Sequence, residues 1–103
     1  MARRIIWSKR AQTDRKSIFK YWNNRNKSNF YSKKLNKLFI SAVEFVSTNP
    51  HTGKITTAEN VRIKFVSHYA IIYEPTDIEL KVHAIFYTRQ NPNKLESIIK
   101  KEK

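Results

Sequence analysis

Six side chains of the types that act on phosphate esters lie in the second half of the sequence. They are Lys54, Arg62, Lys64, His83, Tyr87 and Arg89. An arginine can hold two phosphate oxygens at once, and a histidine, or a lysine whose pKa is lowered by nearby cations, can transfer protons near neutral pH. RNA supplies its own nucleophile, the 2′-hydroxyl. These residue types therefore suffice for metal-free RNA cleavage, with Tyr87 available to orient a hydroxyl or to stack on a base.

The sequence lacks the residue patterns of a metal centre or a nucleotide cofactor. It contains no cysteine and a single glycine, and its histidines, His51, His68 and His83, are not at metal-ligand spacing. We therefore expect no metal and no cofactor. Residue types and charge alone do not separate a nuclease from a non-catalytic binding module, so both interpretations stay open at this point.

The charge of the chain is high and uneven. The 103 residues carry a formal net charge of +13. Residues 1–37 hold 12 lysines and arginines against one acid, Asp14, a net +11, whereas residues 38–103 hold nine cations against seven acids, a net +2. Such a field attracts a polyanionic partner without identifying it. No apolar run approaches the roughly 20 residues that a membrane-spanning helix needs, so we expect no membrane partner.

The spacing of apolar residues predicts a short strand followed by two helices. Residues 3–8 have strand character, and Ser8 is a suitable N-cap for a helix whose apolar face reaches Trp22, with Arg15 as its polar exception. Residues 23–29 are typical of a turn. Ser28 or Asn29 then caps a second helix that ends before Pro50. Two helices joined by a short turn predict an antiparallel hairpin.

After a polar loop over residues 49–60, the apolar pattern changes to a period of two. This period predicts strands over residues 61–65, 69–73 and 78–87, joined by tight turns, and residues 95–99 could form a last short helix. The prediction is therefore one α+β domain over residues 1–103, with a core at about 4–95 and a basic tail at 96–103. Its order is β-α-α-β-β-β, with the helix hairpin on one face of a mainly antiparallel four-stranded sheet.

Strand parity predicts which side chains share the open face of this sheet. In a strand, successive side chains point to opposite faces of the sheet. Alternation therefore places Arg62 and Lys64 on the face opposite to their apolar neighbours, and it places His83 and Tyr87 of the last strand on that same open face. We expect these four side chains to lie on the open face together with Lys81 and Arg89, while Lys54 reaches the face from the preceding loop. Such a face would form an arginine-bearing surface for a polyanion or a protein.

Several short stretches, in order, resemble the RelE/ParE superfamily of bacterial toxins from type II toxin–antitoxin systems. They are residues 5–8 (IIWS), 49–54 (NPHTGK), 61–62 (VR), 69–73 (YAIIY) and 87–92 (YTRQNP). The resemblance covers about residues 4–95. It implies a growth-inhibiting toxin of the bacterial cytoplasm that forms a hetero-oligomer with its cognate antitoxin. RelE-like members cleave mRNA on the ribosome without a metal, whereas ParE-like members poison DNA gyrase without cutting RNA.

The resemblance leaves the target of the toxin open. Arg89 matches an arginine that RelE-like nucleases place on the phosphate, and Lys54 and Lys64 fall near the positions of their catalytic lysines. Against this, Ala70 stands where these nucleases favour arginine, and residues 93–103 contain no tyrosine. The hypotheses are therefore a ribosome-dependent endoribonuclease, a non-catalytic gyrase poison, and a degenerate toxin that only binds its antitoxin.

Overall fold

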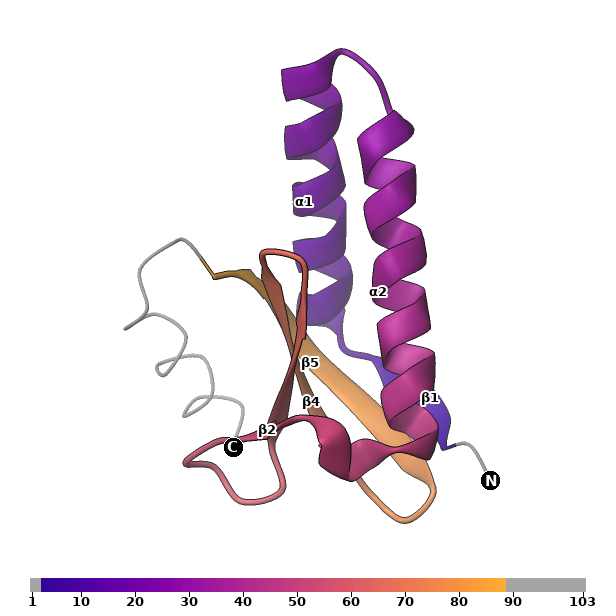
Figure 1. Cartoon of the computed structure of the whole chain (residues 1–103), viewed down its shortest axis with the longest axis vertical. Helices are drawn as coiled ribbons and strands as arrows, with labels where there is room; N and C mark the ends of the chain where they lie inside the picture. Colours follow the sequence, from indigo (N-terminus) through magenta and orange to yellow (C-terminus); the bar gives the residue numbers. More distant parts are fainter. Residues whose placement is uncertain (1–2, 89–103) are drawn as a thin grey trace.

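The computed structural model describes residues 3–88, which fold as two helices packed on one side of a sheet (Figure 1). The elements follow the chain as β1 (Arg4–Trp7), α1 (Lys9–Asn26), α2 (Phe30–Thr48), the 3-10 turn η1 (Pro50–Thr52), β2 (Lys54–Ile55), β3 (Arg62–Val66), β4 (Tyr69–Pro75) and β5 (Glu79–Tyr87). The predicted α+β class and element order are confirmed. The predicted last helix lies outside the described residues.

The helical hairpin begins as the sequence predicts but has a shorter turn. The Ser8 hydroxyl accepts a hydrogen bond from the Ala11 amide at 3.0 Å and so caps α1. The predicted turn at 23–29 is wrong at its start, because α1 continues to Asn26 and ends only where Lys27 adopts a left-handed conformation with φ 56°. A side chain of α2 stabilises this additional last turn of α1, since the Ser32 hydroxyl donates a hydrogen bond to the Asn23 side-chain oxygen at 2.6 Å.

The main core lies between the hairpin and the sheet. Leu35, Phe39, Val43 and Val46 of α2 are almost completely buried. They pack in one cluster with side chains of the sheet, namely Val66, Tyr69, Ile71, Tyr73, Leu80, Val82 and Ile85. The one polar exception on the α1 face is explained by its partner, because the Arg15 guanidinium lies 4.3 Å from the centre of the Trp7 ring. Neither helix in residues 3–88 is both long and apolar enough to cross a bilayer.

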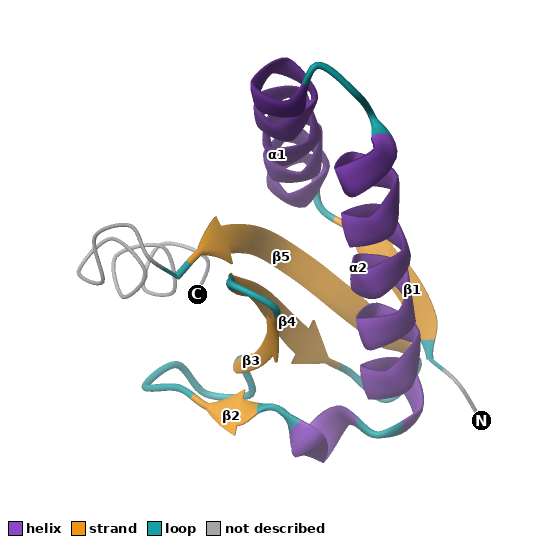
Figure 2. Ribbon diagram, turned by 45° about the horizontal axis from the view of Figure 1, so that its top comes forward, coloured by secondary structure: helices purple, strands orange, loops and turns teal. Residues whose placement is uncertain are grey.

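The sheet is mixed and has five strands in the order β1-β5-β4-β3-β2 (Figure 2). The strand β1 lies parallel to β5, and the other neighbouring pairs are antiparallel. The parallel pair joins the first and last strands of the described chain, so the connection between them runs through both helices and then through β2, β3 and β4. The predicted sheet of four strands lacked β2, a two-residue strand inside the polar stretch that we expected to be a loop.

A β-bulge in β5 reverses the side-chain parity that the sequence suggests. Ile72 pairs with Ala84, but the next residue, Tyr73, pairs with Val82, so His83 is an extra residue in the ladder. Before the bulge the even-numbered Leu80 and Val82 face the helices, and after it the odd-numbered Ile85 and Tyr87 do so. The even-numbered Ala84 instead belongs to an apolar cluster on the other side of the sheet. One inserted residue thus exchanges the two faces for the second half of the strand.

The side of the sheet away from the helices is apolar rather than basic. It carries a second cluster of buried residues, Ala58, Val61, Ile63, Ala70, Ile72, Ala84 and Phe86. The alternating pattern of β3 therefore predicts the wrong face for its basic residues. Ile63 packs into this second cluster, whereas its neighbours Arg62 and Lys64 lie on the side of the sheet that faces the helices. A sheet that buries apolar side chains on both faces gives no sequence signal for which face is which.

The turn between α2 and β2 is fastened to the sheet through Tyr73. The Tyr73 hydroxyl donates to the Pro50 carbonyl at 2.7 Å and accepts from the Gly53 amide at 3.1 Å, and its ring is fully buried. A β-carbon at position 53 would overlap this hydroxyl. Gly53 has an ordinary φ of −73°, so the glycine is required by the close approach and not by the backbone conformation.

We expect Gly53→Ala to destabilise the protein through this contact. The added methyl group must displace the Tyr73 phenol or the turn, and overpacking of this kind costs about 1–3 kcal/mol of unfolding free energy. In a double-mutant cycle measured by urea unfolding, Tyr73→Phe should offset part of this loss because it removes the atom that the methyl group meets. Strict additivity of Gly53→Ala and Tyr73→Phe would contradict this account.

Candidate functional site

Three of the six predicted site residues lie on the helix-facing side of the sheet. Arg62 and Lys64 of β3 are opposite Tyr73 and Ile71 of β4, and both of these β4 side chains belong to the helix-facing core. Tyr87 of β5 packs against the same core. The structure therefore brings Arg62, Lys64 and Tyr87 to one side of the sheet, but it is the side opposite to the one predicted from strand parity.

The Arg62 guanidinium is already engaged by the protein backbone. Its Nη1 atom donates to the Gly53 carbonyl at 2.9 Å and to the His51 carbonyl at 3.2 Å. These bonds hold the turn that Tyr73 also fastens. Burial raises the pKa of the Tyr73 phenol, and the Gly53 amide and the Arg62 charge oppose this shift. Arg62 thus acts in the structure as a brace for residues 51–53.

Lys64 lies in the middle of the helix-facing side, next to α2. Its ammonium nitrogen is 5.1 Å from the centre of the Phe45 ring, a cation–π distance, and Phe45 itself is 49% exposed. Lys64 as a whole is half-buried. A lysine in this setting contributes positive charge at a partly exposed apolar surface.

Tyr87 belongs to an aromatic cluster that joins the end of β5 to both helices. Its ring centre is 5.2 Å from that of Tyr69, and the indole of Trp22 donates to the Tyr69 hydroxyl at 2.7 Å. The Tyr31 ring stacks edge-on against Trp22 at 4.8 Å. A cavity of about 250 Å³ opens beside this cluster, and its walls are Ile18, Tyr21, Trp22, Tyr69 and Tyr87. The sequence patterns did not reveal this cavity.

Tyr69 is not suited to proton transfer at neutral pH. Burial raises the pKa of its phenol above the usual 10.0; the hydrogen bond from Trp22 lowers it, and the neighbouring tyrosines raise it further. The phenol therefore stays protonated and acts as the acceptor for the Trp22 N–H group. This arrangement gives the cluster a structural role that aligns the helical hairpin with β4.

Two predicted site residues lie on the other side of the sheet, which corrects the predicted grouping. His83, the extra residue of the bulge, is within 2.9 Å of a Glu74 carboxylate oxygen. Lys54 is exposed on β2 and pairs with Ile63 of the second cluster. We expect Lys81 on the same face as Arg62. In the strand register it is instead opposite Glu74 of β4, on the side of the sheet away from the helices. Arg89 lies outside the described residues, so its predicted role stays a prediction.

Sequence reasoning missed the structural role of Asp14. Its carboxylate accepts the backbone N–H of Ile85 at 3.1 Å and lies 3.6 Å from the Arg10 guanidinium. It thereby satisfies a backbone donor of β5 that β1 is too short to reach. A signal was present, since Asp14 is the one acid among residues 1–37.

Within residues 3–88 no three histidine or acidic side chains come together as metal ligands would.

The fold, a helical hairpin on one side of a five-stranded sheet, is shared with a solved protein of a toxin–antitoxin system. The solved structure "Chromosomal ParDE TA system from P. aeruginosa" is similar to it, with a TM-score of 0.73, 13% identity, and coverage of 85% of this chain and 98% of that one. At this identity the likeness shows the fold. The family model for the ParE toxin of the type II toxin–antitoxin system parDE matches residues 5–92, so the chain belongs to the ParE toxin family. No curated protein matched the sequence.

We expect the stability of the protein to fall at alkaline pH because of Tyr69 and Tyr73. Both phenols have a folded-state pKa above the usual 10.0. Their contribution to stability is therefore complete below pH 10 and is lost as the pH rises through the folded-state pKa. Urea unfolding between pH 8 and 12 should show this loss, and Tyr69→Phe should flatten the alkaline limb. An unchanged slope in that variant would contradict the assignment.

At pH 8 the Tyr69→Phe variant should lose about 1–2 kcal/mol of unfolding free energy, since the Trp22 indole N–H loses its acceptor.

Proposed function

We propose that this ParE-family toxin arrests growth by acting on DNA gyrase without catalysing a reaction itself. The observation that carries the proposal is the separation of the side chains that a nuclease would need. Arg62 and Lys64 lie on the helix-facing side of the sheet, whereas His83 and Lys54 lie on the other side. A proton donor or acceptor on one face of a sheet cannot act on a phosphate bound to the opposite face.

The distances along the strands support the same conclusion. Arg62 is opposite Tyr73 and Tyr87 is opposite Tyr69, four residues apart on β4. At about 3.3 Å per residue this is a separation of roughly 13 Å, far more than one phosphate spans. The Arg62 guanidinium also donates to two backbone carbonyls, so phosphate binding would compete with the bonds that fasten the turn. A surface that recognises a protein does not need these groups to converge.

The toxin of a type II module pairs with a cognate antitoxin, and this toxin belongs to such a module. With a net charge of +13 it should attract an antitoxin segment rich in acidic residues. The partly exposed side chains beside Lys64 on the helix-facing side, such as Phe45, offer apolar contacts to such a segment. Gyrase as the target places the site of action in the bacterial cytoplasm.

Two assays made in parallel test the proposal. The chain is induced without its antitoxin, mRNA 5′ ends are sequenced, and the purified toxin is added to a gyrase supercoiling reaction. We expect DNA-damage signalling, inhibited supercoiling and intact mRNA. Rapid codon-biased mRNA cleavage with normal supercoiling would establish the ribosome-dependent nuclease instead, and the absence of growth arrest would point to a degenerate toxin.

Single substitutions separate the two mechanisms at the level of residues. If the toxin is not a nuclease, Arg89→Ala and His83→Gln should each leave mRNA 5′ ends unchanged, and His83→Gln should retain growth arrest. Removing a general acid or base typically lowers a rate by 10²- to 10⁴-fold, so a nuclease would lose toxicity in such a variant. Thermal unfolding of each purified variant provides the control for folding. Codon-biased mRNA cleavage by the wild-type toxin that disappears in a stably folded His83→Gln protein would refute the non-catalytic mechanism.

A further inference from the structure

The hairpin carries a strip of positive charge that no acidic residue of the hairpin interrupts. No acid occurs between Asp14 and Glu44, and this stretch contains eight cations, Arg15, Lys16, Lys20, Arg25, Lys27, Lys33, Lys34 and Lys37. All of these except Arg15 are exposed. Arg15 stacks on Trp7, and Arg25 donates to the Tyr21 hydroxyl at 3.3 Å and lies 5.9 Å from the centre of the Trp22 ring. Six exposed lysines remain along α1, the turn and α2.

The placement of four of these cations works against the stability of the helices. Lys16 and Lys20 are one turn apart on α1, as are Lys33 and Lys37 on α2, and like charges at this spacing each destabilise a helix by about 0.2–0.5 kcal/mol. Lys33 also lies near the N-terminus of α2, where the helix dipole is positive and cations are unfavourable. Neither helix has an acid in its first turn. Folding alone does not account for this arrangement, whereas an external polyanion would neutralise it.

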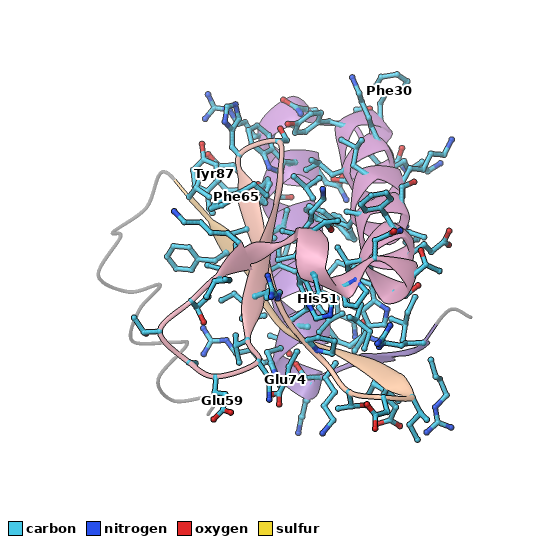
Figure 3. All side chains as sticks on the ribbon, turned by 60° about the horizontal axis from the view of Figure 1, so that its bottom comes forward. Phe30, His51, Glu59, Phe65, Glu74 and Tyr87 are labelled. Atoms are coloured by element: carbon cyan, nitrogen blue, oxygen red, sulfur yellow. The ribbon has the colours of Figure 1, made fainter. Side chains whose placement is uncertain are left out.

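The tip of the hairpin also exposes apolar surface. Phe30, the first residue of α2, is 77% exposed, and Tyr21 on α1 is 54% exposed. Figure 3 shows Phe30 at the far end of the hairpin, pointing away from the sheet, with Glu59 and Glu74 at the opposite end of the molecule. Asp77 and Glu79, in and beside the β4–β5 turn, lie at this opposite end with nearby cations, since Arg4 pairs with Glu79 and Lys81 is opposite Glu74. The excess positive charge is therefore concentrated on the hairpin.

We propose that the tip of the hairpin, residues 20–37, binds double-stranded DNA through its phosphates. Duplex DNA presents one negative charge per about 1.7 Å of its axis, so it suits a rigid strip of cations that no acid interrupts. An exposed aromatic ring among such cations adds contact with sugars or a base step, as in proteins that insert an apolar wedge into a groove. The excess of positive charge on the hairpin orients the approach so that the tip meets the DNA first.

The inference deepens the proposed function, because gyrase works on DNA that it holds. A toxin whose hairpin contacts the duplex would be concentrated at the DNA-bound enzyme, while another part of its surface contacts the protein. The contact is expected to be independent of DNA sequence, since lysine and arginine side chains on phosphates carry no base readout.

Fluorescence anisotropy with a labelled 30-base-pair duplex tests the binding directly, with the full-length toxin and no gyrase present. The tip variant is Lys33→Gln/Lys34→Gln, and the matched control, Lys9→Gln/Lys81→Gln, removes two exposed cations away from the tip. We expect the tip variant to bind about tenfold or more weakly and to lose about two units of the slope of log affinity against log salt, whereas the control changes little. Phe30→Ala should weaken binding without changing the salt slope.

Three results would overturn the inference. Equal losses in the tip variant and its control would mean that only the net charge attracts DNA. Undetectable DNA binding by the wild-type toxin at 50 mM salt would exclude the contact. Tighter binding to vesicles containing anionic phosphatidylserine, or to polyglutamate, than to the duplex would assign the strip to a membrane surface or to an acidic protein. Circular dichroism and thermal unfolding establish that each variant is folded.

A supercoiling assay with the same variants separates this inference from the proposed function. If both hold, the tip variant needs several times more toxin than the control variant to inhibit gyrase. A tip variant that has lost DNA binding yet inhibits gyrase fully would leave the gyrase target standing and refute the role of the hairpin. Tip-dependent DNA binding by a toxin that never inhibits gyrase would support the hairpin contact and refute the gyrase target.

Discussion

The bulge at His83 is the constraint on which the arrangement of the site depends. Without it, β5 would keep one parity from Leu80 to Tyr87, and the rings of Tyr87 and Tyr69 would lie on opposite sides of the sheet. With the extra residue, Val82 and Tyr87 both face the helices, although they differ by an odd number of positions. Tyr87 can then pack against Tyr69, and through Tyr69 the sheet is hydrogen-bonded to Trp22 of α1. The position of His83 beside Glu74 is the other consequence of the same insertion.

A second constraint uses residues of catalytic type for a structural purpose. Arg62 and Tyr73 together bind the backbone of residues 50–53 through four hydrogen bonds to Pro50, His51 and Gly53. This part of the chain leaves α2 and enters β2 with few apolar side chains of its own, so its backbone polar groups need partners from the sheet. A buried phenol and a partly buried guanidinium supply them. The types of these residues alone therefore do not identify them as catalytic.

The sequence predicts the fold well and the site poorly, for identifiable reasons. The period of 3.6 in α2 and the Ser8 cap locate the hairpin, since local signals control where a helix begins and which face it buries. The tight turn at Ser67 and His68 likewise fixes the pairing of β3 with β4. Alternation fails for the site because it assumes one polar face and an unbroken register. Here both faces of the sheet are apolar in part, and no local signal announces the extra residue at His83.

The contrast between the two ends of the molecule separates what folding requires from what it leaves to a partner. Around the sheet, several charged groups have internal partners: Arg4 pairs with Glu79, Asp14 accepts a hydrogen bond from the Ile85 amide, and His83 contacts Glu74. Along the hairpin, the exposed cations repel each other within single helix turns and lie far from most of the acids. A stretch of protein that carries avoidable repulsion gains stability when a polyanion binds, because binding removes the repulsion as well as adding contacts. The hairpin should therefore become more stable on DNA, which is the thermodynamic counterpart of its affinity for it.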